Sequence, residues 1–271
     1  MITHEPEPLD RPRQSFYHRH EGLILGGTTA LIALGIWQAS WSAGKISPLF
    51  FTGPSAVLKR FGEEWTEGRL KADLAYSGIN FIVGVGAAIA AGVVLGVVIG
   101  WYRRLAMVCE PFLSALYATP RVALVPLILI WFGIGMWSKV FIVFINAFFP
   151  VLINTIGGIR ATDADLLRAA RAYCASDWQI FKTVAIPGAV PFILTGVRQA
   201  VALGLIGVVV GEMFGGSEGI GFMVAYGGTN LQTDTLFVGV AIIAGAGIVL
   251  TSLAEQLEKR FSRWRPEREE R

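Results

Sequence analysis

Four long runs without a charged residue limit this chain more than any other feature of its sequence. Each holds roughly the 20 residues that an α-helix needs to cross a lipid bilayer. The runs are residues 23 to 43, 74 to 102, 140 to 159 and 236 to 254. Charged residues make up 16% of the chain, against about 25% in a typical soluble domain. The sequence therefore predicts a polytopic membrane protein rather than a water-soluble globule.

Two further segments are apolar apart from one arginine each. Residues 111 to 135 contain Arg121, and residues 188 to 211 contain Arg198. Six transmembrane helices result, and the predicted fold class is all-α, a polytopic membrane helix bundle over residues 23 to 254. Residues 1 to 22 and 255 to 271 are predicted to be polar segments at its two ends.

The distribution of lysine and arginine predicts the orientation of this bundle. With six spans, both termini lie on one side, and the segments on that side carry 15 lysines and arginines against six on the other. Cytoplasmic loops hold the excess of these residues in membrane proteins. We therefore expect a multi-pass protein of the cell (inner) membrane with both termini in the cytoplasm.

The longest outer loop contains a short amphipathic pattern. Within residues 55 to 65, Val57, Phe61 and Trp65 recur every four residues beside charged side chains. Such a pattern is typical of a helix that lies at a membrane surface, in contact with lipid. We expect this helix at the outer interface.

Small residues recur at four-residue intervals in the second and fifth predicted spans. Close packing between membrane helices depends on small side chains, because lipid provides little hydrophobic drive for association. A general abundance of glycine in membrane helices is the alternative explanation. The residues expected at helix contacts are Gly84, Ala88, Gly92, Gly96, Gly100, Gly196, Ala200 and Gly204.

The residues required for several kinds of chemistry are missing from the predicted spans. All three histidines precede the first span, and the two cysteines, Cys109 and Cys174, form neither a disulfide framework nor a metal motif. Near Gly44 and Lys45 the pattern of a phosphate-binding loop is incomplete. The sequence thus predicts no catalytic residue, no cofactor and no metal, and the net charge of +3 indicates no nucleic-acid partner.

Residues 160 to 187 form the longest inner connection, and their pattern is helical. Thr162 with Asp165 predicts the start of one short helix, and Ser176 with Gln179 predicts a capping box that starts a second. The second helix carries Trp178 on one face and is expected to end before Pro187. Its large apolar side chains either dock another protein or pack against the chain's own helix ends and lipid headgroups.

This connection resembles a motif of bacterial ATP-binding-cassette importer permeases. That motif has Glu-Ala-Ala, a Gly four residues beyond the second Ala, and Ile-x-Leu-Pro after nine more residues. The chain keeps every interval but has Arg168 in place of Glu and Cys174 in place of Gly. The cysteine makes a left-handed backbone at the turn less expected. The matching positions, with the helix residues between them, are Arg168, Ala169, Ala170, Cys174, Ser176, Trp178, Phe181, Val184, Ile186 and Pro187.

The similarity extends from about Pro111 to Val240 and is greatest to the nitrate, sulfonate and taurine branch of that family. The residues that carry it include 120 to 126, 131 to 133 and 207 to 214. The resemblance implies a type I importer permease fold, a homodimer or paired permease, two cytoplasmic ATP-binding subunits and an extracytoplasmic solute-binding protein. It implies no catalysis by the chain itself, and it makes the helix from Asp177 to Val184 the coupling helix that seats in the ATPase.

One charged residue lies deep in a predicted span. Arg121 is the eleventh residue of the third span, where an unpaired charge costs at least about 2.5 kcal/mol. We expect it to line the path of a small anion, with Asn146 and Asn154 as polar companions. The alternative is a structural arginine bound to carbonyls that Pro120 and Pro126 leave free.

Two other functions are compatible with the pattern of spans. An ion-gradient-driven secondary carrier or channel is one alternative, and a membrane assembly subunit that transports nothing is the other. ATP dependence separates the importer from the carrier. The substrate cannot be read from the sequence, because the resemblance assigns specificity largely to the separate binding protein.

Overall fold

The chain is built from α-helices in the computed structural model, which describes residues 16–44, 47 and 49–262. No strand occurs among these residues. In chain order the helices are α1 (Phe16–Ser42), α2 (Pro54–Thr66), α3 (Leu70–Trp101), α4 (Arg103–Ala118), the 3₁₀ turn η1 (Arg121–Leu124), α5 (Val125–Phe132), α6 (Met136–Arg160), α7 (Ala164–Ala172), α8 (Asp177–Ile180), the π-helical turn η2 (Phe181–Ala185), α9 (Ile186–Gly215), α10 (Ile220–Thr229) and α11 (Thr233–Ser262).

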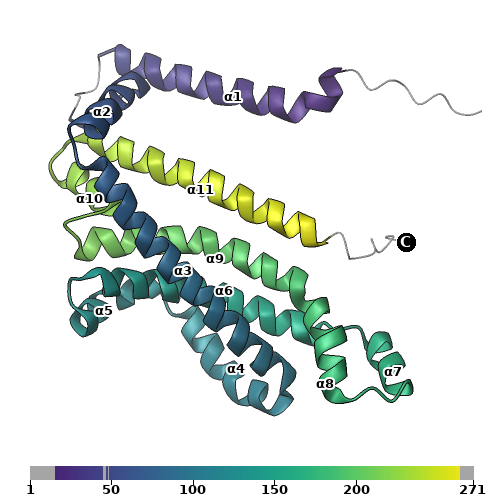
Figure 1. Ribbon diagram of the computed structural model, residues 1–271. Coiled ribbons are helices and arrows are strands. Elements are labelled where there is room, and N and C mark those ends of the chain that lie inside the picture. The colour runs from purple at the N-terminus through teal and green to yellow at the C-terminus, as the bar shows by residue number, and fades with distance from the viewer. Residues whose placement is uncertain (1–15, 45–46, 48, 263–271) are drawn as a thin grey trace, which may run out of the picture.

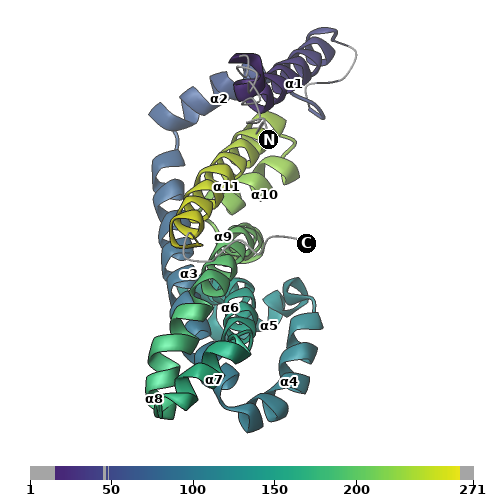
Figure 2. The same ribbon diagram turned by 90° about the vertical axis from the view of Figure 1, so that its right-hand side faces the viewer.

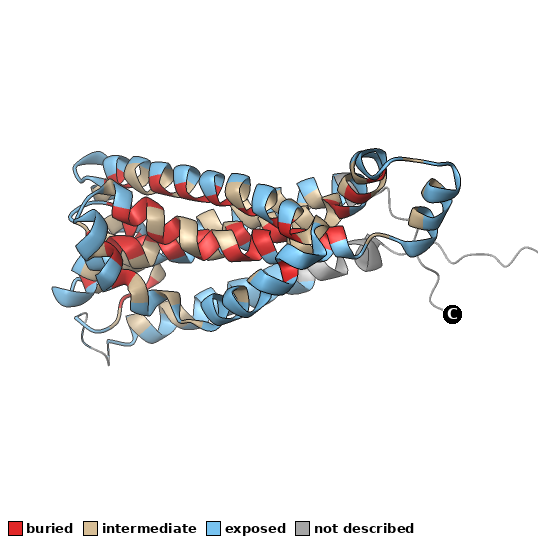
Figure 3. Ribbon diagram, turned by 90° about the horizontal axis from the view of Figure 1, so that it is seen from below, coloured by how far each residue is buried: buried red, intermediate tan, exposed pale blue. Residues whose placement is uncertain are grey.

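Helices α3, α6 and α9 form the centre of the bundle. Buried residues gather along these inner helices, whereas the outer helices are mostly exposed (Figure 3). The main apolar cluster joins all three, with Ala88 from α3, Val151 from α6 and Ala200 from α9 fully buried. Helix α6 is therefore packed on two sides.

Glycines set the close approach of α3 to α6. A Cβ atom added at Gly84 would lie 2.6 Å from the Val143 side chain, and one at Gly96 would lie 2.5 Å from Thr155. Gly92 and Gly100 meet α6 in the same way. On α9, Gly196 faces α6 and Gly204 faces α3. Side chains at these positions would push the helices apart.

Four helices are long and apolar enough to cross a membrane, within the residues that the structure describes. They are Leu70–Trp101, Met136–Arg160, Asp177–Gly215 and Thr233–Arg260, and the pair α4 with η1–α5 passes the same test as one broken span. Helix α1 covers most of the first predicted span, and its crossing remains a prediction. Residues 255 to 262, predicted to be part of a polar tail, instead continue α11, where Glu255 pairs with Lys259 one turn on.

The third predicted span, residues 111 to 135, is wrong in its start and in its continuity. Helix α4 begins at Arg103 and carries Pro111 inside it. The chain then bends by 87° between α4 and the residues from Arg121 onward. Thr119 and Pro120 have extended backbone, because a residue before proline avoids the helical region. Figure 2 shows α4 set off to one side of the central helices, with α5 back beside α6.

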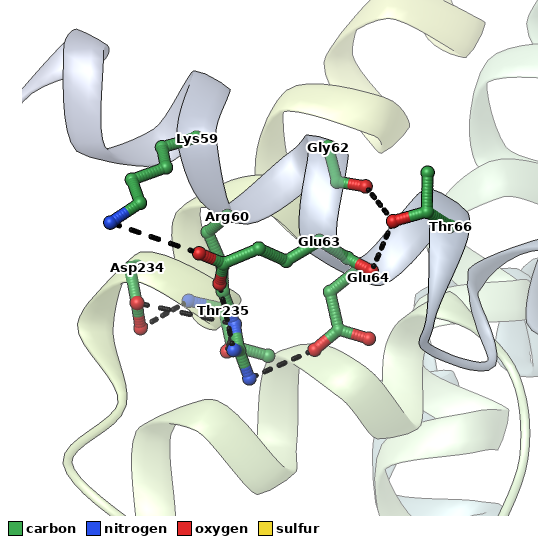
Figure 4. A network of polar contacts seen from close by, with 8 residues as sticks. All are labelled: Lys59, Arg60, Gly62, Glu63, Glu64, Thr66, Asp234 and Thr235. Atoms are coloured by element: carbon green, nitrogen blue, oxygen red, sulfur yellow. Dashed lines mark hydrogen bonds and ion pairs between the residues drawn. The ribbon is translucent and has the colours of Figure 1, made fainter.

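Helix α2, predicted over residues 55 to 65, is confirmed, and it contacts both the end of α1 and the start of α11. Arg60 donates from Nε to the Thr235 hydroxyl at 3.0 Å and pairs with Glu64 at 2.9 Å, as Figure 4 shows. On α1, the Trp37 indole N–H donates to the carbonyl of Thr52 just before α2. The rest of α1 runs apart from the bundle (Figure 1).

Candidate functional site

A helical hairpin follows α6 and projects from one end of the bundle (Figure 1). Its first helix, α7, is capped by Asp163, whose carboxylate accepts from the Asp165 N–H at 2.7 Å. The prediction of Thr162 as the cap is wrong, because the Thr162 hydroxyl donates instead to the carbonyl of Ile159 at the end of α6. Arg168, which replaces the glutamate of the motif, is exposed and pairs with Asp165.

Cys174 ends α7 in a left-handed conformation, with φ of 57°. The Ala175 N–H donates to the carbonyl of Ala170, and the Cys174 N–H donates to that of Arg171. These two bonds define a Schellman motif, in which the left-handed residue is usually glycine. The expectation that a cysteine would disfavour this conformation is therefore wrong: the hydrogen bonds of the turn hold Cys174 where the family motif has Gly.

The second helix of the hairpin starts at the predicted capping box. The Ser176 hydroxyl accepts from the Gln179 N–H, and the Gln179 side chain accepts from the Ser176 N–H. The helix does not end before Pro187, contrary to the prediction. A π turn over Phe181–Ala185, with the Ile186 N–H bonded to the carbonyl of Phe181, carries the helix into α9. Its wider ring of five residues makes room for the proline, which lacks an N–H and would clash in a regular turn.

The large apolar side chains of the hairpin divide between its surface and its base. Trp178 is 68% exposed and Tyr173 is 88% exposed. Phe181 packs edge-on against Trp101 of α3, with ring centroids 4.9 Å apart. Val184 and Ile186 are partly buried, and Ala185 is buried. The base thus fixes the hairpin to the bundle, and Trp178 and Tyr173 remain available to a partner.

Arg121 lies at the break between α4 and α5, against two aromatic rings. Its Cζ atom is 5.0 Å from the ring centre of Tyr117 and 5.2 Å from that of Phe149. Its Nε is buried and has no hydrogen-bond partner among the described residues. Cation–π contacts are worth roughly 0.5 to 2 kcal/mol each, so the rings offset part of the cost of the charge, while the Nε hydrogen is left without an acceptor.

The two predicted polar companions of Arg121 lie instead where α6 packs against α9, since a Cβ at Gly207 of α9 would lie 3.4 Å from Asn146. The Asn146 amide donates to the carbonyl of Ile142, within α6. The Asn154 amide donates to the carbonyl of Pro150 and to the side chain of Gln199 on α9. A Cβ at Gly196 would meet Asn154, which places this asparagine at the contact of α6 with α9.

A buried polar cluster at the other end of the bundle was not predicted. Glu212 on α9 is fully buried, and its carboxylate accepts from the Ser77 hydroxyl, the Asn80 amide and the Gly221 N–H at 2.8 to 3.1 Å. Asp73 accepts from the Gly219 N–H at 2.8 Å. The spacing of Asp73, Ser77 and Asn80 on one face of an apolar helix was the available signal. The cluster fixes the start of α10, a helix that the sequence analysis did not predict.

The fold defines a class of protein. A bundle of apolar helices carries a projecting hairpin with an exposed tryptophan, and the chain is a membrane permease, a transport subunit rather than an enzyme. Residues 88–263 match the family described as "Binding-protein-dependent transport system inner membrane component", and the chain belongs to that family. Permeases of this family work with ATP-binding subunits and a binding protein, and the chain is a multi-pass inner-membrane protein.

Individual relatives and a solved structure agree with this assignment. The chain is 32% identical to SsuC of Bacillus subtilis (strain 168), named as an aliphatic sulfonates transport permease, over 94% of this chain and 91% of that protein. It is 31% identical to the taurine transport system permease protein TauC of Escherichia coli (strain K12), over 89% of each chain. The structure of the inward-facing MetNI methionine ABC transporter matches with a TM-score of 0.63 at 14% identity, covering 73% of this chain and 98% of that one.

Proposed function

We propose that two copies of this chain form the translocation path of an ATP-driven importer for a small organic or inorganic anion, such as a sulfonate or nitrate. Two cytoplasmic ATP-binding subunits drive the pair, and an extracytoplasmic protein delivers the solute. Both termini and the hairpin of α7 and α8 lie in the cytoplasm, in keeping with the excess of lysine and arginine on that side.

The hairpin is the coupling element in this proposal. Trp178 presents an exposed apolar surface, while Phe181 ties the hairpin to Trp101 of α3. Exposed aromatic side chains are frequent anchors of protein interfaces. Because the helix continues without interruption from Asp177 to Gly215, a displacement of the hairpin by the ATPase reaches the centre of the bundle.

A double substitution tests the coupling role. Trp178→Ala with Phe181→Ala should lower ATP-dependent uptake at least tenfold while the permease remains inserted in the membrane. Trp137→Ala is the matched control, because Trp137 is equally exposed but lies at the opposite end of α6. Normal uptake by the double variant would remove the coupling assignment.

The proposal of an anionic substrate rests on one observation, the surroundings of Arg121. Among the residues that the structure describes, Arg121 has no ion pair with a carboxylate, and its buried Nε has no hydrogen-bond partner. A cation held in this way favours a negatively charged ligand. Relatives named for sulfonate and taurine transport support the same class. Nothing in the described residues favours the ion-gradient-driven carrier.

Uptake of radiolabelled taurine, ethanesulfonate and nitrate tests this assignment in cells that contain the permease, its ATPase and its binding protein. The wild type should accumulate at least one of the three in an ATP-dependent manner. Arg121→Gln should lose most of that uptake and Arg121→Lys should retain part of it. Arg69→Gln is the control, since Arg69 is exposed and pairs with Glu218. Normal transport by Arg121→Gln would contradict the role of this arginine.

A further inference from the structure

A furrow runs along the bundle between α4 and α6. Two adjoining hollows of about 390 and 610 Å³ make it up, and they share Glu110 and Arg160 in their linings. Ile99 and Gly100, near the end of α3, line its floor. We propose that this furrow is the route by which the transported anion leaves the bundle toward the cytoplasm. The inference deepens the proposed function and rests on it.

One continuous face of each helix lines the furrow. On α4 this face follows a helical repeat from Ala106 through Glu110 and Ser114 to Tyr117. On α6 the corresponding face runs from Arg160 through Gly157 to Ile153. Two parallel faces of this length form a channel wall rather than an isolated surface dimple.

The furrow begins at the unpartnered arginine. Tyr117, the last residue of the α4 face, has its ring against Arg121, and Phe149, one turn before Ile153 on α6, contacts the same guanidinium. Arg121 therefore lies beside Tyr117, at the inner end of the furrow. An anion bound at Arg121 is next to the start of the furrow.

The larger hollow, farther from Arg121, is lined by two arginines. Arg160 and Arg103 both line the larger hollow, near the ends of α6 and α4. Glu110 lies 3.8 Å from Arg160, and both side chains are more than 40% exposed. Exposed pairs of this kind are worth little and open readily. The pair can therefore part to let Arg160 receive the anion, and Glu110 then repels it toward the cytoplasm.

The interior of the furrow has few groups that could bind a small anion tightly, as a route for its release requires. In the smaller hollow, between Tyr117 and the Glu110–Arg160 pair, the lining is apolar apart from the Ser114 hydroxyl, and Gly157 contributes no side chain. A Cβ at Gly157 would meet nothing within 4 Å. The furrow is open along one side.

Filling the furrow tests the route without disturbing the packing. Gly157→Leu should lower uptake of the transported anion at least tenfold, with unchanged co-purification of the ATPase. Gly86→Leu is the matched control, because Gly86 also lies within a helix, on α3, and has no atom within 4 Å of an added Cβ. If the wild type takes up none of taurine, ethanesulfonate and nitrate, the proposed function fails. If the wild type transports and Gly157→Leu equals it, the furrow is overturned and the proposed function stands.

Chemical labelling tests the route with a substitution, Ser114→Cys, that hardly changes the size of the side chain. In a background with Cys109→Ala and Cys174→Gly, Ser114→Cys should react with the anionic, membrane-impermeant reagent methanethiosulfonate ethylsulfonate in inside-out vesicles, and the transported anion should slow this reaction at least threefold. Ala90→Cys should not react. The two positions are matched in depth, because Ala90 lies 11 residues before the end of α3 at Trp101 and Ser114 lies 11 residues after the start of α4 at Arg103. Ala90 is exposed on α3 and lies outside the furrow. An unreactive Ser114→Cys, or one that the anion does not protect, overturns the route.

Discussion

At the scale of the residue, the turn at Cys174 keeps its left-handed conformation although cysteine replaces the glycine that this conformation prefers. A left-handed conformation costs a non-glycine residue roughly 1 to 2 kcal/mol, and glycine loses about 0.5 to 1 kcal/mol more entropy on folding than alanine. Cys174→Gly should therefore stabilise the hairpin by roughly 0.5 to 1 kcal/mol. Slower hydrogen exchange of the amides from 164 to 175 would show this, with Ala172→Gly, in the last turn of α7, as a control that speeds exchange.

Glu212 provides a second prediction at this scale, because its carboxylate accepts three hydrogen bonds in a fully buried site. Glu212→Gln keeps the shape but replaces one acceptor by a donor that faces other donors. A buried donor left without a partner costs roughly 1 to 3 kcal/mol, so the thermal midpoint of the purified complex should fall clearly. Glu218→Gln removes an exposed pair with Arg69, worth at most about 1 kcal/mol. Equal midpoints for the two variants would show that the cluster is not structural.

Arg121, which the sequence analysis singled out, and Glu212, which it did not, differ in how far their surroundings could be predicted. A single charge in an apolar span is visible without a structure. The partners of Glu212 are not, because Ser77 lies 135 residues away and meets it only through the packing of α3 on α9. One of the two aromatic rings around Arg121 was missed for a related reason: Phe149 belongs to α6 and meets Arg121 only through the packing of the helices. Tyr117 lies four residues before Arg121, a spacing that places side chains together on a helix.

At the scale of the element, the small residues of α3 are predicted to set the distance between helices. Gly96→Leu forces a side chain into the space occupied by Thr155. Overpacking of this kind typically costs roughly 1 to 3 kcal/mol, so the thermal midpoint should fall and the yield of folded protein should decrease. Gly86→Leu, on the open side of the same helix, should leave the midpoint within about 0.5 kcal/mol of wild type. The reverse order would show that the α3–α6 contact is not limiting.

Hydrophobic length indicated where apolar helices lie but not where they break. The runs within α3, α6 and α11 are long enough to be recognised directly. The break in the third segment follows from one extended pair, Thr119 and Pro120. By contrast, Pro111 lies inside α4, and Pro187 lies in the first turn of α9, where the preceding π turn joins it to α8. Proline thus has different effects at different positions, because neighbouring turns either adjust to it, as the π turn before Pro187 does, or do not. Helix α10 was missed because its ten residues are too few to resemble a span.

At the scale of the whole molecule, we expect the hairpin of α7 and α8 to move together with α9 as one rigid lever when the ATPase closes. Cys174 is exposed at the tip of the hairpin and Cys109 is only partly buried, so the variant Cys109→Ala carries one reactive thiol per chain. ATP with vanadate traps the ATPase in its closed form, and spin labels on the two Cys174 side chains of the proposed dimer should then lie closer together. The reason is that closure draws the two hairpins together, and the helix from Asp177 to Gly215 moves with them. The distance should be longer without nucleotide, and Trp178→Ala with Phe181→Ala should weaken the change. A distance that is the same in both states would contradict the lever, and the absence of any dipolar signal would contradict the dimer.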